Sequence, residues 1–358
     1  MAIDFVSNQE IIVAARRKLE QGPWDYLVGG SESETTMRRN RLGFDRLAFR
    51  PRVLRDVSQL DASALFLGHQ LRVPVMLAPI GGLQTFDPAG AVASAWASEK
   101  FGTVPVISSV TQPALEETAA ATGSPKIFQL YVDGDWDWIK AMLTRVKQAE
   151  YVGLCLTVDT AMYSRRERPM LDRYNARQGR TPTDQRWRAS ITWELMDRIK
   201  DFAGLPFLVK GIATAEDAAL AVEHGVEVIW VSNHGGRQLD HGRGTIEVLP
   251  EIVQAIGGRA QVVLDGGIQR GSDVLKALAL GANAVAIGKL QGWGLAAAGV
   301  DGLVRVLELL EEEIQIAMAL LGVTRLDQLD SSYLCAAEPV TFPHEMSAFV
   351  NLPESQVR

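Results

Sequence analysis

From residue 73 onward, short runs of apolar and mostly β-branched residues alternate with amphipathic segments of helical spacing. Within the runs the apolar positions are continuous rather than alternating with polar ones, which is typical of parallel strands covered on both faces. Eight such runs occur, at residues 73–79, 104–109, 126–131, 153–159, 206–211, 226–233, 260–267 and 283–289. Eight strand–helix units over about 220 residues predict an α/β fold of the (β/α)₈ TIM-barrel type rather than an open doubly wound sheet.

The remaining segments frame this barrel within one predicted domain of 358 residues. Residues 1–70 are predicted to form a mostly helical segment that caps the N-terminal side of the barrel or flanks its mouth. Residues 71–345 are predicted to form the barrel, and residues 346–358 a C-terminal tail. Residues 160–199 are the longest gap between strands, and only 191–199 has a helical pattern. In an ordered barrel such a loop is typical of a lid, a binding loop or a disordered excursion.

Charge and composition narrow the classes of partner. The formal net charge of −7 argues against general attraction to nucleic acid or to an anionic membrane. No apolar run reaches the ~18 residues that a membrane-spanning helix needs, and the first residues lack the basic-then-apolar order of a signal peptide. Cys155 and Cys335 stand alone, which favours neither a disulfide framework nor a zinc site. We therefore expect a cytoplasmic, reduced protein.

Polar residues and glycines follow the predicted strands. In (β/α)₈ barrels, the residues just past the C-terminal end of each strand form the active-site face. The residues at these ends are Pro79, Ile80, Gly81, Ser108, Gln129, Tyr131, Thr157, Asp159, Lys210, His234, Arg237, Asp265, Gly267, Gly288 and Lys289. Packing alone does not account for this composition, so the pattern predicts a binding or catalytic site.

The motif "SNHGGRQ" carries the clearest chemistry, because His234 and Arg237 flank two glycines and can face one cavity. Histidine suits proton uptake near neutral pH, and the planar guanidinium suits a carboxylate. Asp159, at the end of another strand, can orient the imidazole and stabilise its charged form. Further candidates for binding the same anion are Arg166, Tyr26 and Tyr131.

Two further features point to a cofactor or a phosphate. Lys210 ends the fifth strand and is driven inward by the preceding "PFLV". A lysine at the mouth of a barrel can be a Schiff-base nucleophile, a phosphate ligand or a charge beside a cofactor. Glycine-rich turns follow the last two strands within residues 264–289, where barrels often bind phosphate with backbone N–H groups and a helix N-terminus.

In combination, the motifs "SNHGGRQLD", "FQLY", "LTVDT", "LVKG" and "DGGIQRGSDVLKALALGA" resemble the FMN-dependent 2-hydroxy-acid oxidase and dehydrogenase family. That family includes glycolate oxidase, lactate oxidase, lactate monooxygenase and mandelate dehydrogenase. The similarity runs over nearly the whole chain, from "PWDYLVGGSESETT" to "GLAAAGVDGLVRVLELLEEEIQIAMALLG". It implies an oxidoreductase that uses FMN to convert an L-2-hydroxy acid into the 2-oxo acid, and a homotetramer, the common assembly in this family.

The resemblance also implies catalytic roles. His234 would be the base that takes the hydroxyl proton, or the Cα proton if the carbanion account holds, and flavin N5 would accept the hydride. Asp159 would hydrogen-bond the histidine, and Tyr131 would lie near the reacting hydroxyl. Arg166 and Arg237 would clamp the substrate carboxylate with help from Tyr26, while Val110 and Tyr163 would shape the pocket for the substrate side chain.

On the cofactor side, the resemblance places Lys210 by flavin N1, where its charge would stabilise the reduced, anionic ring. The other positions that match cofactor-binding residues are Pro79, Ile80, Gly81, Ser108, Gln129, Thr157, Ser232, Asp265, Gly267, Gln269, Gly288 and Lys289.

The chain departs from the family at the predicted phosphate site. Gln269 and Lys289 stand where members usually have arginine. Lysine keeps one charge but loses the bidentate fork, and glutamine loses the charge altogether. Arg270 is the neighbouring arginine that could compensate, although the residue at that place normally points elsewhere. We therefore predict weaker binding of FMN or a site altered for another purpose.

Further departures concern the substrate pocket. Gly81 stands where simple oxidases tend to have alanine, which resembles the dehydrogenase and monooxygenase members. Val110 replaces a large aromatic residue of glycolate oxidases, so the predicted substrate is bulkier than glycolate, with an aryl or long-chain side group. Ala161 replaces a usual proline, and the loop after the fourth strand is shorter than in most members, which predicts a more open mouth.

Three alternatives stay open on sequence grounds. The same fold can act on a specialised substrate such as a modified peptide or a pathway intermediate, although intact Arg166 and Arg237 favour a free carboxylate. A flavin-poor, non-catalytic binding barrel is supported only by Gln269 and Lys289. A Schiff-base aldolase that uses Lys210 leaves "SNHGGRQ" unexplained. The electron acceptor is open among oxygen, a quinone and a carrier protein.

Overall fold

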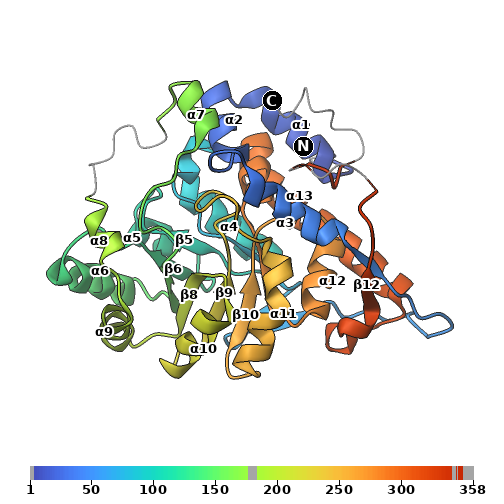
Figure 1. Ribbon diagram of the computed structural model, residues 1–358. Helices are drawn as coiled ribbons and strands as arrows, with labels where there is room; N and C mark the ends of the chain where they lie inside the picture. The colour runs from blue at the N-terminus through green and yellow to red at the C-terminus, as the bar shows by residue number, and fades with distance from the viewer. Residues whose placement is uncertain (1–3, 176–183, 341–343, 345, 350–358) are drawn as a thin grey trace.

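A closed ring of eight parallel strands forms the centre of the molecule (Figure 1). The computed structural model describes residues 4–175, 184–340, 344 and 346–349. The strand order is β4-β11-β10-β9-β8-β7-β6-β5, and a bridge between Leu77 and Pro105 brings β4 back to β5. The strands are β4 (Val75–Leu77), β5 (Val106–Ser108), β6 (Ile127–Leu130), β7 (Gly153–Thr157), β8 (Phe207–Ile212), β9 (Val228–Val231), β10 (Gln261–Leu264) and β11 (Ala284–Ile287). The predicted barrel is confirmed, with a strand within each of the eight apolar runs or one residue beyond its end.

Burial on both faces of the sheet explains why the strand sequences are continuously apolar. In β9, Val228 and Trp230 belong to the cluster inside the barrel, whereas Ile229 and Val231 belong to the larger cluster under the helices. Cys155 of β7 likewise points inward and is fully buried as a free thiol. Because alternate residues face two apolar layers, neither face tolerates the polar positions of a half-exposed strand.

Helices surround the ring. They are α4 (Gly90–Phe101), α5 (Leu115–Ala120), α6 (Trp136–Gln148), α9 (Trp193–Ala203), α10 (Ala215–Glu223), α11 (Thr245–Ile256), α12 (Gly271–Ala279) and α13 (Lys289–Leu321). Side-chain caps fix several starts, as at α10, where the Thr214 side chain accepts the Asp217 N–H. In α13 the backbone bends at Ala298 and Gly299, whose dihedral angles are not helical. None of the helices in the described part of the chain is long and apolar enough to cross a membrane.

The first 70 residues are helical only as far as Asp45. They form α1 (Asn8–Lys18), α2 (Gln21–Val28) and α3 (Thr35–Asp45), and then β1 (Leu47–Phe49), β2 (Ala64–Phe66) and β3 (His69–Leu71). The β2–β3 hairpin inserts Phe66 and Leu71 into the cluster inside the barrel, at the end opposite the predicted site. Strand β1 pairs with β12 (Leu334–Ala336) near the end of the chain. The segment therefore does both of the things that were expected as alternatives: the β2–β3 hairpin caps the N-terminal side of the barrel, and α2 and α3 flank its mouth.

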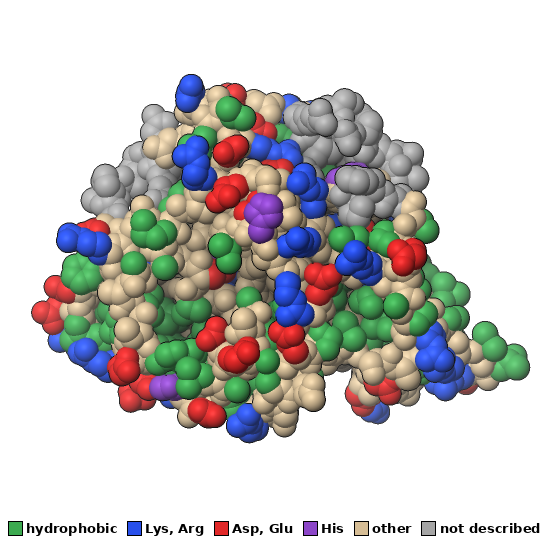
Figure 2. Space-filling model, in the orientation of Figure 1, with side chains coloured by type: hydrophobic (Ala, Val, Ile, Leu, Met, Phe, Trp, Pro, Cys, Tyr) green, Lys and Arg blue, Asp and Glu red, His purple; other side chains and the backbone are tan. Residues whose placement is uncertain are grey.

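The long loop between β7 and β8 contains more helix than its sequence predicts. It forms α7 (Glu167–Leu171) and α8 (Arg186–Ala189) before the expected helix α9. Helix α7 packs beside α2 at the top of the molecule in Figure 1. Short 3₁₀ turns are η1 (Leu83–Thr85), η2 (Leu326–Gln328) and η3 (Ser331–Tyr333). On the face shown in Figure 2, basic and acidic side chains are interspersed.

Candidate active site

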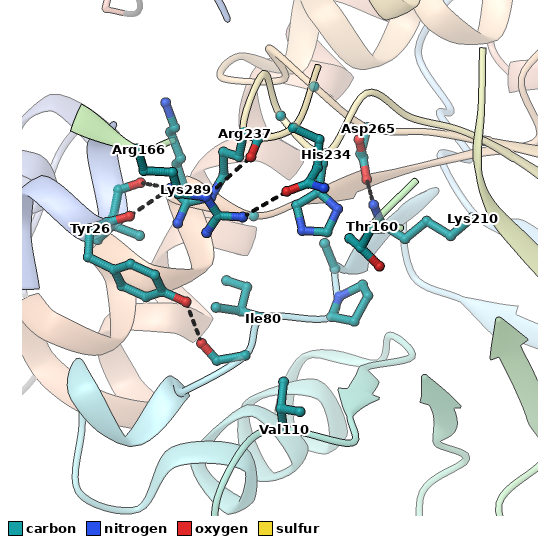
Figure 3. A pocket seen from close by; sticks show the side chains of 18 of the residues that line it. Tyr26, Ile80, Val110, Thr160, Arg166, Lys210, His234, Arg237, Asp265 and Lys289 are labelled. Carbon is teal, nitrogen blue, oxygen red and sulfur yellow. Dashed lines mark hydrogen bonds and ion pairs between the residues drawn. The ribbon is translucent and has the colours of Figure 1, made fainter. Parts of the chain in front are cut away.

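A cavity of about 1190 Å³ opens at the C-terminal ends of the strands, between the barrel and α2 and α3 (Figure 3). This volume exceeds the range of about 300–1,000 Å³ that is usual for small-molecule sites. Predicted residues that line it are Tyr26, Pro79, Ile80, Gly81, Val110, Tyr131, Tyr163, Arg166, Lys210, His234, Arg237, Asp265, Gly267, Gln269, Gly288 and Lys289. Ser108, Gln129, Thr157, Asp159 and Ser232 are predicted residues that lie behind this lining.

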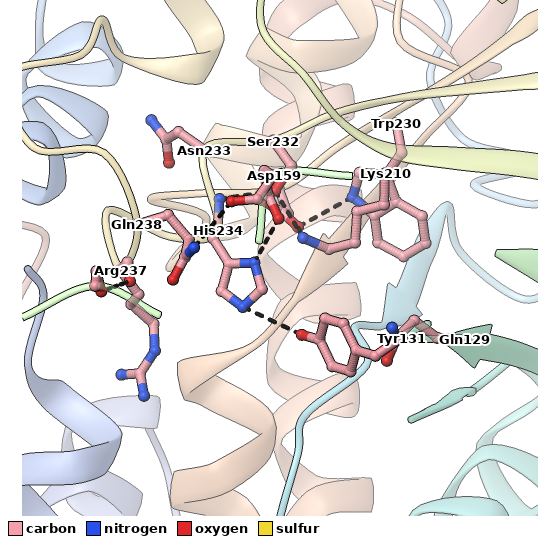
Figure 4. A network of polar contacts seen from close by, with 12 residues as sticks. Gln129, Tyr131, Asp159, Lys210, Trp230, Ser232, Asn233, His234, Arg237 and Gln238 are labelled. Carbon is pink, nitrogen blue, oxygen red and sulfur yellow. Dashed lines mark hydrogen bonds and ion pairs between the residues drawn. The ribbon is translucent and has the colours of Figure 1, made fainter. Parts of the chain in front are cut away.

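His234 and Asp159 form a pair at the centre of the site (Figure 4). His234 Nδ1 lies 2.9 Å from Asp159 Oδ1, and His234 Nε2 lies 3.5 Å from the hydroxyl of Tyr131. The approach of Asp159 depends on Gly211, which forms a β-bulge in β8. Gly211 has a φ of +117°, and a Cβ there would meet Asp159 Cβ at 2.7 Å. The glycine after Lys210 therefore makes room for the carboxylate that orients the histidine.

The electrostatics of this pair suit a base. Burial lowers the pKa of His234 below its ordinary value, and the charge of Asp159 only partly offsets this effect. Burial acts to raise the pKa of Asp159, but the charges of His234 and Lys210 outweigh it and hold the pKa below its usual range. At neutral pH the imidazole is neutral and Asp159 is ionised. His234 Nε2 is thus able to accept a proton that the neighbouring carboxylate then stabilises.

Two arginines stand beside the histidine. Arg237 Nη1 donates to the backbone oxygens of Tyr26 (2.6 Å) and Gly29 (2.9 Å) at the C-terminal end of α2. Burial, followed by the charge of Arg166, lowers the pKa of Arg237 to about 10. The Arg166 guanidinium lies over the Tyr163 ring, 4.4 Å from its centroid, and its Nε donates to the Arg237 carbonyl. Two cations at the edge of one cavity create a strong preference for an anionic ligand.

Lys210 is held from behind by two groups. Its Nζ donates to Ser232 Oγ (2.8 Å) and lies 3.1 Å from Asp265 Oδ2. Burial acts to lower the pKa of Lys210, but the charges of Asp265 and Asp159 outweigh it, so the pKa lies above its ordinary value. The lysine is therefore a fixed cation in the cavity wall. A protonated amine of raised pKa is unsuited to Schiff-base chemistry, which requires the neutral amine.

The predicted phosphate end is built from two turns. Gly267 has a φ of +89°, and a Cβ there would lie 2.9 Å from the Asn40 carbonyl, so only glycine fits. Gly288 directly precedes α13, whose N-terminus adds the positive end of a helix dipole. Lys289 Nζ lies in the cavity wall and donates to the Val28 carbonyl at 2.6 Å.

The two departures from the family pattern leave this end with fewer arginine donors. Gln269 is buried in the cavity wall, with its backbone N–H donating to Asp273 Oδ2. Arg270 turns away from the cavity: its Nη1 lies 3.1 Å from Glu313 Oε1, and its guanidinium lies over Phe349. Arg270 therefore does not compensate for Gln269.

The wall near Lys210 fits a flavin ring. Gln129 Nε2 and Thr157 Oγ are buried and have no hydrogen-bond partner among the described residues. Thr157 is the register partner of Lys210, and Ser108 Oγ orients Gln129 by donating to its Oε1 at 2.7 Å. Buried donors without partners are costly, so these two groups just behind the lining favour a ligand with acceptor atoms at this place. The carbonyl and ring-nitrogen edge of a flavin has them.

Several residues at the site were not predicted from the sequence. Asn40 on α3 exchanges two amide hydrogen bonds with Asn233, which ties α3 to the loop that carries His234. Arg188 on α8 makes a two-pronged ion pair with Asp133 and lies 4.3 Å from the Tyr131 ring centroid. The position of Asn233 within "SNHGGRQ" was an available signal. Arg188 follows a polar loop without periodicity, so no pattern in the sequence indicated it.

Tyr26 and Val110 line the cavity on either side of Gly81. The Tyr26 hydroxyl donates to the Gly81 carbonyl at 2.8 Å. A Cβ at Gly81 would meet the Val110 side chain at 2.8 Å. A methyl group at position 81 and the side chain of Val110 would therefore compete for the same space.

Known proteins resemble this chain over almost its full length. The family model described as FMN-dependent dehydrogenase matches residues 15–336. An L-lactate oxidase from Nostoc sp. is 38% identical over 89% of this chain and 95% of its own. Glycolate oxidase from Spinacia oleracea is 37% identical over 94% of this chain and 96% of its own. A crystal structure of mandelate oxidase superposes with a TM-score of 0.86 at 36% identity, covering 94% of this chain and all of the other.

These matches confirm the resemblance inferred from the motifs, and with it FMN as the cofactor. With a family model spanning most of the barrel and relatives above 30% identity over nearly the whole length, the chain belongs to the FMN-dependent dehydrogenase family.

Proposed function

We propose that this protein oxidises an L-2-hydroxy acid to the corresponding 2-oxo acid. The observation that carries the proposal is the pairing of His234 with Asp159 in the same cavity as Arg166 and Arg237. A base next to two cations matches a substrate that has an ionised carboxylate beside a hydroxyl group. The names of the relatives, which include lactate, glycolate and 2-hydroxyacid oxidases, support this substrate class.

FMN, when bound, supplies the acceptor for the two electrons that leave the substrate. The residues of the chain bind the substrate, orient it and take up its proton. Arg237 and Arg166 bind the carboxylate and fix its orientation, which can lower a barrier by about 7–11 kcal/mol when the geometry is good. His234 Nε2 takes the proton from the substrate, with the charge that develops on the ring stabilised by Asp159. The Tyr131 hydroxyl, whose pKa burial raises to about 12, stays protonated and donates to the substrate oxygen.

The lining of the cavity supports a substrate larger than glycolate. About 1190 Å³ exceeds the usual range for one small ligand, and this cavity is to hold FMN and the substrate together. Val110 and Gly81 both line the cavity, and the Val110 side chain occupies the place that a methyl group at position 81 would need. Tyr163 and Phe86 add aromatic surface, which favours a hydroxy acid with a bulky apolar side group.

An anaerobic absorbance experiment tests the proposal. The purified protein is mixed with L- and D-2-hydroxy acids of increasing side-chain size, and bleaching of the flavin spectrum is followed. We expect L-acids larger than glycolate to bleach it fastest. Bound flavin that no hydroxy acid reduces would contradict the substrate class.

The base is tested with the same assay. His234→Ala should keep the flavin colour but lose reduction by the substrate. Reduction at an undiminished rate would contradict the role of His234 and would leave the substrate class standing.

We propose a cytoplasmic homotetramer, from the two isolated cysteines and from the usual assembly of the family. Light scattering of the holoprotein tests the assembly. Comparing oxygen with a quinone and with an artificial acceptor in steady-state assays identifies the electron acceptor.

A further inference from the structure

Trp230 is a large side chain at a place where the barrel interior is otherwise mostly small and aliphatic. It lies in β9, is fully buried, and packs with residues such as Val228 and Val263 inside the ring. Its indole Nε1–H donates to Asp265 Oδ2 at 3.0 Å. Figure 4 shows the ring next to the Lys210 side chain, which lines the cavity. Trp230 itself does not line the cavity.

The carboxylate of Asp265 is shared by three donors. Its Oδ1 accepts from Ser232 Oγ at 2.7 Å. Its Oδ2 accepts from Trp230 and lies 3.1 Å from Lys210 Nζ. Lys210 Nζ also donates to Ser232 Oγ. One carboxylate oxygen thus faces both a neutral N–H group and a cation.

Competition at Oδ2 has an electrostatic consequence. A hydrogen bond to a carboxylate stabilises the negative charge and draws electron density toward the donor. The hydrogen bond from the Trp230 N–H reduces the negative charge that Asp265 Oδ2 presents to Lys210. Asp265 therefore neutralises the charge of Lys210 less completely. The effect is strong because all three side chains are buried in a medium of low dielectric constant. The ring also limits the movement of Lys210, whose Nζ lies 5.7 Å from the ring centroid.

We infer that Trp230 is a positioning residue for Lys210: it holds Asp265 so that Lys210 presents more of its positive charge to the cavity and raises the electron affinity of the bound FMN. The inference rests on the proposed function for the placement of the flavin ring beside Lys210. It assigns to a residue outside the cavity a part in setting the reduction potential.

The test compares two buried tryptophans. Trp230→Phe removes the N–H but keeps an aromatic ring. Trp293→Phe is the matched control, because Trp293 is equally buried and its Nε1 has no partner among the described residues. The midpoint potential of the bound FMN is measured in the holoprotein with a chemical reductant, so the result does not depend on the substrate. We expect a lower potential in Trp230→Phe and an unchanged one in Trp293→Phe.

Steady-state kinetics add a second readout. Trp230→Phe should lower kcat by about tenfold, which corresponds to about 1.4 kcal/mol, with little change in KM because Trp230 does not touch the substrate site. Equal potentials in the two variants would overturn the inference. Failure of every hydroxy acid to reduce the flavin would overturn the proposed function instead.

A measurement on the unaltered holoprotein keeps the inference testable if Trp230→Phe does not fold. The chain has eight tryptophans, and ¹⁵N labelling gives one indole N–H resonance for each. The Trp230 resonance, assigned by its contacts to Val263 inside the barrel, should shift when the FMN is chemically reduced, whereas the Trp293 resonance should not. A Trp230 resonance that does not respond would overturn the inference.

Discussion

Replacing Asp159 by asparagine isolates the charge behind the proposed base. Asparagine has nearly the same shape as aspartate. Its Oδ1 is able to accept the hydrogen bond from His234 Nδ1, which lies 2.9 Å from Asp159 Oδ1 in the structure. The variant removes only the negative charge that would face a protonated imidazole. Side-chain exposures of 16% for His234 and 11% for Asp159 place the pair largely away from water.

The expected loss of rate follows from the free energy that a buried charged pair contributes. A hydrogen bond to a charged group contributes about 1.5–3 kcal/mol, and breaking a buried ion pair costs about 3–5 kcal/mol. Taking about 3–4 kcal/mol, and about 1.4 kcal/mol per factor of ten, we expect Asp159→Asn to slow flavin reduction by roughly 10²- to 10³-fold. Stopped-flow absorbance under anaerobic conditions measures this rate directly.

The pH profile gives the variant a second signature. His234 acts as a base only when neutral, so the rate falls as the pH drops through its pKa. Burial lowers this pKa in the wild type, and Asp159 partly opposes the shift. Loss of the Asp159 charge removes the opposing effect, so the acidic limb of the profile should move to lower pH while the plateau falls.

A matched control uses another Asp–His pair, one that lies away from the cavity. Asp197 Oδ2 lies 2.7 Å from His224 Nδ1, and neither residue lines the cavity. Asp197→Asn should leave both the rate and the profile unchanged. The reasoning is refuted if Asp159→Asn reduces its flavin within about twofold of the wild-type rate, or if both variants lose activity equally.

Gln269→Arg should tighten retention of FMN by roughly ten- to a hundredfold, since a charged hydrogen bond adds about 1.5–3 kcal/mol; fluorescence titration of the apoprotein measures it, and equal tightening of riboflavin, which lacks the phosphate, would contradict the mechanism. Arg188→Met removes the cation over the Tyr131 ring and should lower kcat/KM by about tenfold; unchanged kcat/KM would show that this ion pair does not act on the site. Arg41→Met leaves the buried carboxylate of Asp273 without its two-pronged partner and should cost about 3–5 kcal/mol of stability. A thermal unfolding midpoint equal to that of the wild type would refute the last prediction.

The barrel was predictable because its strands are buried on both faces, which produces eight continuous apolar runs in a regular order. The residues at the strand ends were predictable for the same reason: Lys210, His234 and Arg237 lie at or just past the ends of apolar runs, where a barrel exposes its mouth. Together with the family motifs, this pattern indicated the central charged residues of the site but fewer than half of the residues that line the cavity.

Contacts between segments far apart in the chain were not predictable. Asn40 reaches Asn233 across 193 positions, and Arg188 meets Asp133 from a loop with no periodic pattern. Trp230 reads as one more apolar residue of a buried strand, and only the structure shows its N–H against Asp265. Such pairs depend on the packing of α3, α8 and the barrel, which no local pattern encodes.

The Arg237 side chain takes part in two contacts, because it both hydrogen-bonds the C-terminal end of α2 and lines the cavity. A guanidinium has five N–H donors, and Nη1 is engaged by carbonyl groups of the N-terminal segment. Docking of α2 onto the barrel and capture of an anion are thus two binding events on one group. By thermodynamic linkage, a carboxylate that binds Arg237 and holds its side chain in place also stabilises the contact between α2 and the barrel. Binding of an anion in the cavity should therefore slow the hydrogen exchange of backbone amides in α2, outside the site itself.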